Sequence, residues 1–153
     1  GGLAISRATL PIFSEAHVQN GVDTNNLAIF WVRLIFIFGL LVLLIAWFAA
    51  PLVIEVLFER GAFSAKNTEA VTNIFRYASL HIPFYFTATI LVSALAARHR
   101  YKALAINGVA LILSKLFFAY CLTRLFEVYG LMASTALMYM FSTLLLYYLM
   151  VRR

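Results

Sequence analysis

Several polar side chains lie inside long apolar stretches, where a charged or amide group is costly unless it has a partner. Lys115 interrupts one such stretch, and Asn107 lies eight residues before it. Arg76 lies near the end of another stretch. A charge in the middle of a membrane span costs about 2.5–3.5 kcal/mol even on insertion scales, so such residues typically mark a substrate or ion path. Lys115, Arg76 and Asn107 are therefore candidates for lining a hydrated path that a polar headgroup could follow.

Each candidate also has a purely structural explanation, and the sequence leaves both open. Lys115 is about two helical turns from the end of its stretch, so its stem could carry the ammonium to the interface. Arg76 is about one turn from the end of its stretch and fits an interfacial position. Asn107 could form an interhelical hydrogen bond, which is worth only about 0.6 kcal/mol on average. The same explanation covers two further lines of polar residues: Thr72, Ser79 and Thr87, and Thr135, Tyr139 and Ser142.

No arrangement of residues typical of an enzyme is present. The histidines His17, His81 and His99 are far apart in sequence, and the glycines form no phosphate-binding loop. No Cys-x-x-Cys motif or His/Cys cluster has the spacing of a zinc site. The single cysteine, Cys121, cannot form an internal disulfide. The sequence therefore predicts no catalytic residue, no metal and no cofactor.

The elements that must position these residues are four apolar stretches, each close to the roughly 20 residues that cross a hydrocarbon core. Hydrophobic residues make up 64% of the chain and charged residues 12%, against about 45–50% and about 25% in soluble domains. A soluble fold of this length could not bury so much apolar surface, and the alternation of β-barrel strands is missing. We expect an all-α integral membrane protein, beginning with the end of an earlier helix. The expected transmembrane helices span about 27–58, 66–98, 103–125 and 130–151.

The basic residues predict the orientation of these helices. Four crossings place the larger basic group on one side: Arg7, Arg33, Arg98, Arg100, Lys102, Arg152 and Arg153. The other side receives fewer basic residues and most of the acidic ones: Arg60, Lys66, Arg76 and Arg124, with Glu55, Glu59, Glu69 and Glu127. The positive-inside rule makes the first side cytoplasmic, with both ends of the chain there. The net charge of +6 then reflects membrane topology, and no nucleic-acid partner is expected.

The turn between the second and third stretches is the most basic part of the chain, with Arg98, Arg100 and Lys102 within five residues. One explanation is a topology determinant that contacts anionic lipid headgroups. The other is a contact for a diphosphate headgroup at the inner leaflet. The sequence alone does not separate these two hypotheses.

The segment Leu57–Ser64 resembles the Leu-Phe-x-Arg-Gly-Ala-Phe turn of MurJ/MviN lipid II flippases. The residues that carry this match are Phe58, Arg60, Gly61, Ala62 and Phe63. Weaker similarities follow the family's order along nearly the whole chain, at Thr9–Ser14, Ala50–Leu52, Tyr77–Pro83 and Tyr129–Leu131. One turn differs, because residues 97–104 lack the Asp-Thr and Pro that the family usually has there.

The resemblance implies part of a two-lobed transporter of the MOP superfamily, in the bacterial cytoplasmic membrane. Such a transporter moves undecaprenyl-diphosphate-linked peptidoglycan precursor, lipid II, to the outer leaflet by alternating access. The family's main substrate arginines lie in segments before Gly1, so none is assigned here. The implied partners are the polyprenyl-diphosphate glycolipid, the bilayer, the rest of the transporter and cell-wall synthesis proteins. A related polysaccharide-repeat exporter, a cation-coupled antiporter and a non-transporting membrane scaffold remain alternatives.

Overall fold

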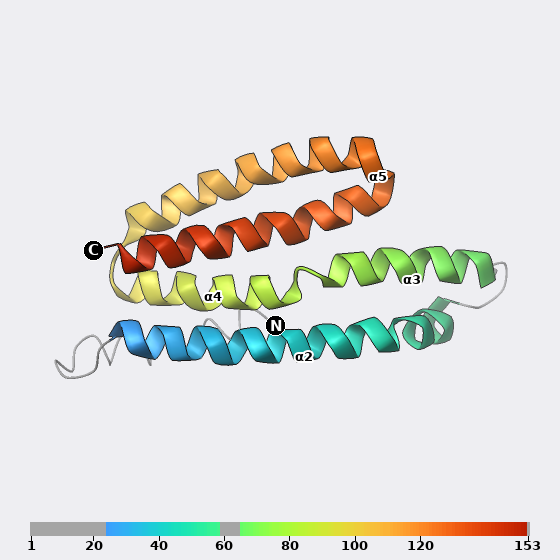
Figure 1. The fold of residues 1–153 in the computed structure, drawn as a ribbon, viewed down its shortest axis with the longest axis horizontal. Helices are drawn as coiled ribbons and strands as arrows, with labels where there is room; N and C mark the ends of the chain where they lie inside the picture. Colours follow the sequence, from blue (N-terminus) through green and yellow to red (C-terminus); the bar gives the residue numbers. More distant parts are fainter. Residues whose placement is uncertain (1–23, 59–64, 153) are drawn as a thin grey trace.

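The computed structural model describes residues 24–58 and 65–152, and in these ranges the chain is almost entirely α-helical. The helices are α2 (Thr24–Phe58), α3 (Ala65–Ser79), α4 (Ile82–Ala97) and α5 (Tyr101–Val151), as Figure 1 shows. Within the described ranges, three stretches are long and apolar enough to cross a membrane: Ile29–Phe58, Thr68–Ala97 and Tyr101–Val151. The all-α membrane class is confirmed, and four crossings stay a prediction.

Helix α5 is a hairpin of two antiparallel arms. Its 51 residues are more than twice the number that one crossing needs. The backbone leaves helical geometry at Glu127, with φ 51° and ψ −126°, and Figure 1 shows the ribbon doubling back in this region. We call residues 101–126 the first arm and residues 128–151 the second arm. Gly130 lets the arms meet closely at the turn, because a Cβ at this position would lie 2.1 Å from the carbonyl oxygen of Leu122.

The second apolar stretch is divided into two helices, because α3 ends at Ser79 and α4 begins at Ile82. The sequence predicted one continuous helix over 66–98. Proline has no amide hydrogen, and the first turn of a helix is where none is needed, so Pro83 fits the start of a new helix. Gly39 of α2 packs against this point, since a Cβ on it would lie 2.7 Å from the Pro83 Cα.

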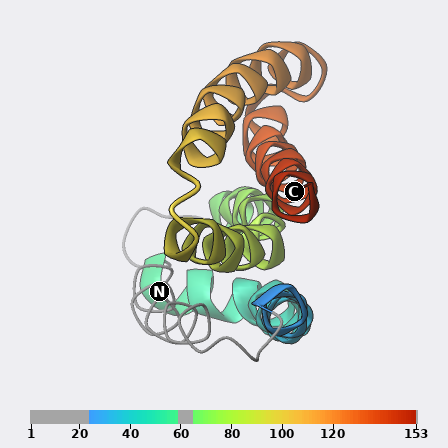
Figure 2. The same ribbon diagram turned by 90° about the vertical axis from the view of Figure 1, so that its left-hand side faces the viewer.

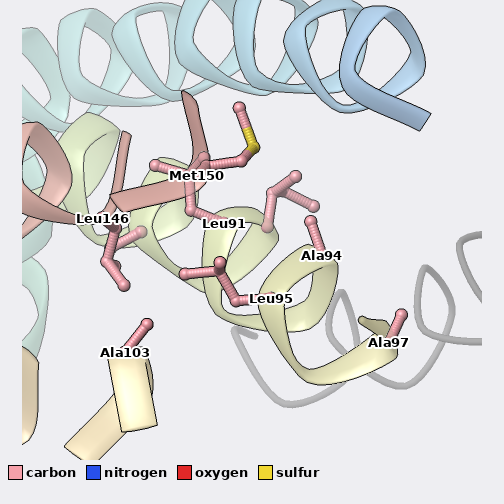
Figure 3. Close-up of a cluster of buried hydrophobic side chains, with 9 residues drawn as sticks. Leu91, Ala94, Leu95, Ala97, Ala103, Leu146 and Met150 are labelled. Carbon is pink, nitrogen blue, oxygen red and sulfur yellow. The ribbon is translucent and has the colours of Figure 1, made fainter. Parts of the chain in front are cut away.

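Helix α4 is the centre of the described bundle, with α2 on one side and the α5 hairpin on the other (Figures 1 and 2). Its buried side chains form one apolar cluster with the two ends of α5 (Figure 3). The members are Ala88, Ile90, Leu91, Ala94, Leu95 and Ala97 from α4, and Ala103, Leu146 and Met150 from α5. The alanines let the helix backbones approach closely, as is common between membrane helices.

The outer surfaces of α2 and of the first arm of α5 expose many large apolar side chains. Phe48 of α2 is 76% exposed and Leu125 of α5 is 73% exposed. In water such surfaces would be costly, because leaving one large apolar side chain fully exposed costs about 1.5–3 kcal/mol relative to burying it. Lipid, or further membrane helices, would cover them at no such cost.

Candidate functional site

Two polar contacts join the arms of α5 within the apolar part of the hairpin. Asn107 and Ser142 are both buried, and the Ser142 Oγ donates a hydrogen bond to the Asn107 Oδ1 at 2.9 Å. The Lys115 Nζ donates to the Ser134 Oγ at 2.9 Å and to the Thr135 Oγ1 at 2.7 Å. We call these five residues the polar seam. The seam ties the first arm to the second through groups that would be costly to leave unpaired in lipid.

The contacts of the seam follow one antiparallel register. Asn107 pairs with Ser142, and Lys115, eight residues later, pairs with Ser134, eight residues earlier than Ser142. Eight residues are slightly more than two helical turns, so each arm presents one face to the other. Arg100 continues the register: it lies seven residues before Asn107, and its Nη1 donates at 2.7 Å to the carbonyl oxygen of Leu149, seven residues after Ser142.

Lys115 is half-buried, and its ammonium points across to the second arm. A lysine ammonium has three N–H donors, and three oxygens lie within reach. Besides the two hydroxyls, the carbonyl oxygen of Leu131 lies 3.4 Å from Nζ. All three acceptors are neutral, and among the described residues no carboxylate pairs with this ammonium. The hydrogen bonds of Lys115 are therefore satisfied, while its charge is not neutralised.

Arg76 of α3 contacts the backbone of α2 at the point where a proline removes a donor. Its Nε donates to the carbonyl oxygen of Trp47 at 3.2 Å, and its guanidinium carbon lies 5.7 Å from the centre of the Trp47 ring. In an α-helix this carbonyl would accept from the amide of residue 51, but Pro51 has no amide hydrogen. Arg76 supplies the missing donor. Figures 1 and 2 show that the last turns of α2 change direction.

A cleft of about 330 Å³ opens beside this contact, where α2, α3 and the turn of α5 meet. The rings of Tyr77 and Tyr129 meet across it, with centroids 5.4 Å apart. Its other walls are Trp47, Asn73, Arg76 and Phe126. The cleft is thus mainly aromatic, with one cation and one amide.

His81 packs between α4 and the second arm. Its ring stacks on Tyr139 with centroids 5.6 Å apart and meets the edge of Tyr85 at 6.2 Å. Its Nδ1 contacts the carbonyl oxygen of Ala78. These contacts give His81 the packing role that is usual for a histidine in an apolar environment.

The basic turn lies between α4 and α5, at the end of the bundle that also holds the C-terminus of α5 (Figure 1). The Arg100 Nη1 donates to the carbonyl oxygens of Leu149 and Arg152, at 2.7 and 3.0 Å. Lys102 is exposed, whereas Arg98 is half-buried. Arg100 therefore helps to close the hairpin, and Lys102 faces outward beside it.

A comparison with protein-family models matches residues 2–153 to the family described as "Lipid II flippase MurJ". The match spans almost the entire chain. The chain belongs to the MurJ family. Comparisons with curated proteins and with solved structures gave no match.

Membership of the MurJ family confirms the resemblance found in the sequence and makes the chain a bacterial membrane protein of a transporter family. The turn that suggested this family falls largely outside the described residues. Phe58 is the exposed last residue of α2, and Arg60, Gly61, Ala62 and Phe63 lie outside the description. Among the described residues no group of three metal-binding side chains occurs.

The structure distributes the candidate residues of this MurJ-family chain over three places. Asn107 and Lys115 share the polar seam, Arg76 lies against α2, and the basic turn closes one end of the bundle. Ser134, whose hydroxyl binds Lys115, was not among the candidates predicted from the sequence, although Thr135 beside it was. An adjacent Ser-Thr pair in the first turns after a helix break was the available signal. Thr143 was not predicted either; its Oγ1 donates a hydrogen bond to the Phe84 carbonyl oxygen at 3.0 Å.

Proposed function

We propose that this chain is part of a transporter that moves lipid II across the bacterial cytoplasmic membrane by alternating access. The observation that carries the proposal is the family match over residues 2–153. The long apolar helices support it, since they are suited to a lipid environment. On this proposal, residues 1–153 belong to a single transmembrane domain.

The proposed topology has four crossings: α2, then α3 with α4, then each arm of α5. The basic turn and Arg152 lie on the cytoplasmic side, as the positive-inside rule favours. The described acidic residues Glu55, Glu69 and Glu127 lie at the other end of the bundle, near the end of α2, the start of α3 and the turn of α5 (Figure 1).

In this transporter the α5 hairpin acts as one rigid unit. Alternating access requires parts of the bundle to rock against each other without unfolding. The polar seam and Arg100 hold the two arms in one register over most of their length. Lys115 adds a positive charge without a described carboxylate partner, which favours the diphosphate of the passing headgroup. Asn107 and Arg76 have positioning roles. Asn107 holds the two arms of the hairpin together, and Arg76 holds the bend of α2 against α3.

The basic turn is the proposed contact at the inner leaflet, where the headgroup of lipid II begins its passage. Arg98, Arg100 and Lys102 supply charges of the right sign for a diphosphate. The differing turn sequence at residues 97–104 would then affect how the substrate is received, without altering the helical framework.

Growth complementation tests the proposal. The intact chain that contains this sequence is expressed in bacteria whose own lipid II flippase can be depleted, and its amount in the membrane is measured by immunoblot. We expect the chain to restore growth and cell shape. Failure to restore growth at a normal membrane level would favour the scaffold or a related exporter of another glycolipid.

A further inference from the structure

A second cleft, of about 610 Å³, lies at the basic end of α5. Its lining consists of the basic or polar residues His99, Arg100 and Lys102, the aromatic residue Tyr101, and apolar residues that include Ile106 and Leu149. The volume falls within the range of about 300–1,000 Å³ that is usual for small-molecule sites. It is separate from the polar seam and from the aromatic cleft near Arg76, which lie further along the bundle toward the turn of α5.

Among the described residues, no acidic side chain lies near the basic residues of this cleft. The first turn of α5 contains no acidic residue, although the N-terminus of a helix favours anions. The acidic residues that the structure describes are all near the opposite end of the bundle. The first amide groups of the helix, at Tyr101 and Lys102, also have no acceptor within the helix by geometry. Basic side chains and a helix N-terminus thus act together in favour of an anion.

Arg100 is held in place at this cleft. Both of its described hydrogen bonds come from Nη1 and end on neutral carbonyl oxygens, those of Leu149 and Arg152. These contacts fix the guanidinium without neutralising it. Such preorganisation lowers the entropy lost when a ligand binds. On the other side, His99 is fixed by the Tyr101 hydroxyl, 3.2 Å from its Nδ1.

The apolar side of the cleft indicates a lipid rather than a free anion. Tyr101 is 61% exposed and Ile106 is 55% exposed. They continue into the apolar outer surface of the first arm, where Val109 is also exposed. A ligand with an anionic headgroup and an apolar chain would match both parts at once.

We propose that this cleft binds the phosphate headgroup of an anionic membrane lipid, with the acyl or prenyl chain lying along Tyr101 and Ile106. The headgroup contacts Lys102 and the first amide groups of α5, while Arg100 contributes charge from its fixed position. The proposal rests on the membrane placement given under the proposed function and does not require transport. Basic clefts between membrane helices are known binding places for phosphate headgroups.

Lipid titration of the intact chain tests this. The protein is purified in a neutral detergent and titrated with dioleoyl phosphatidylglycerol, dioleoyl phosphatidylcholine, undecaprenyl diphosphate and glycerol 3-phosphate, and bound ligand is counted by native mass spectrometry. The test variant is Lys102→Gln, because Lys102 is exposed and its loss leaves the hairpin contacts intact. The matched control is Arg124→Gln, which removes one positive charge near the other end of the first arm.

We expect Lys102→Gln to weaken binding of an anionic lipid about fivefold, as one basic residue near a membrane surface contributes, and Arg124→Gln to leave it unchanged. If phosphatidylglycerol shows this effect, the occupant is a bulk phospholipid; if only undecaprenyl diphosphate shows it, the occupant is the polyprenyl lipid. The proposal is overturned if both variants behave alike, if phosphatidylcholine binds as well as phosphatidylglycerol, or if glycerol 3-phosphate binds as tightly as the lipids. None of these results depends on transport, so the proposed function is tested separately.

Discussion

The hydrogen bond from Arg76 to the carbonyl oxygen of Trp47 leads to a quantitative prediction. Replacing Arg76 with Met keeps an apolar stem and removes the donor. The Trp47 carbonyl then has neither Arg76 nor an amide hydrogen from Pro51. A hydrogen bond that involves a charged group contributes about 1.5–3 kcal/mol, and the contact with the Trp47 ring adds about 0.5–1 kcal/mol. We expect Arg76→Met to lower the free energy of unfolding by about 2–4 kcal/mol.

A second substitution separates these contributions. In the Pro51→Ala variant, residue 51 regains an amide hydrogen and can bind the Trp47 carbonyl oxygen within α2. Adding Arg76→Met in that background then removes only the ring contact, at a cost of about 0.5–1 kcal/mol. The double-mutant cycle should therefore show a coupling energy of about 1.5–3 kcal/mol between positions 51 and 76.

The assay is denaturation of the intact chain in mixed micelles by increasing mole fractions of dodecyl sulfate, followed by circular dichroism. Trp47 fluorescence gives a local readout in a background where Trp31, the other tryptophan of residues 1–153, and any tryptophan of the rest of the transporter are replaced by Phe. Arg124→Met is the control, since Arg124 lies over the Tyr120 ring at 4.9 Å and makes no described contact with α2. The reasoning is refuted if Arg76→Met costs the same with and without Pro51.

Three further outcomes are expected. Gly130→Ala should destabilise the chain by about 1–3 kcal/mol, because the added Cβ would lie 2.1 Å from a carbonyl oxygen of the first arm. Lys115→Met should change the free energy of unfolding by less than about 1 kcal/mol, because removing an uncompensated charge from the apolar hairpin offsets the lost hydrogen bonds, and the hydroxyl partners keep acceptors within their own helix. The same substitution should lower lipid II transport about tenfold. Single cysteines at His99 and Glu127, in a cysteine-free background, should be labelled by an impermeant maleimide from opposite sides of the membrane.

Each outcome has its own control. Gly108→Ala is the match for Gly130→Ala, because no atom lies within 4 Å of a Cβ there, and it should stabilise the helix by about 0.5–1 kcal/mol. An equal effect at both glycines would show that the hairpin turn has no steric requirement. Lys115→Arg keeps the charge, so transport that falls equally in both lysine variants would point to shape rather than charge. Labelling of both cysteines from one side would exclude the hairpin topology.

The sequence predicted the class of fold because composition alone decides it. Long apolar stretches without alternation fit membrane helices and little else. The division of α3 from α4 could not be read from it, since Pro83 suits either a kink or the first turn of a new helix. The structure shows the second arrangement, with Gly39 of α2 packed against that proline.

The contacts of the candidate residues could not be predicted from the sequence, for a different reason. Periodicity placed Thr135 and Ser142 on one line of a helix, but which helix they face depends on the register of the hairpin. That register is fixed by the turn at Glu127 and by the close approach at Gly130, which are tertiary features. Likewise nothing in the sequence joins Arg76 to Pro51, because their contact passes through the Trp47 carbonyl oxygen, a backbone atom.

The most direct test of the central claim is the rate at which labelled lipid II becomes accessible at the outer face of the cytoplasmic membrane. The intact chain is supplied to cells depleted of their own flippase, and accessibility is followed over time with an impermeant reagent. We expect lipid II to become accessible at the rate seen in undepleted cells, and at a lower rate in the Lys115→Met variant. If lipid II stays inaccessible while the chain is folded and present in the membrane at a normal level, this chain does not serve lipid II transport.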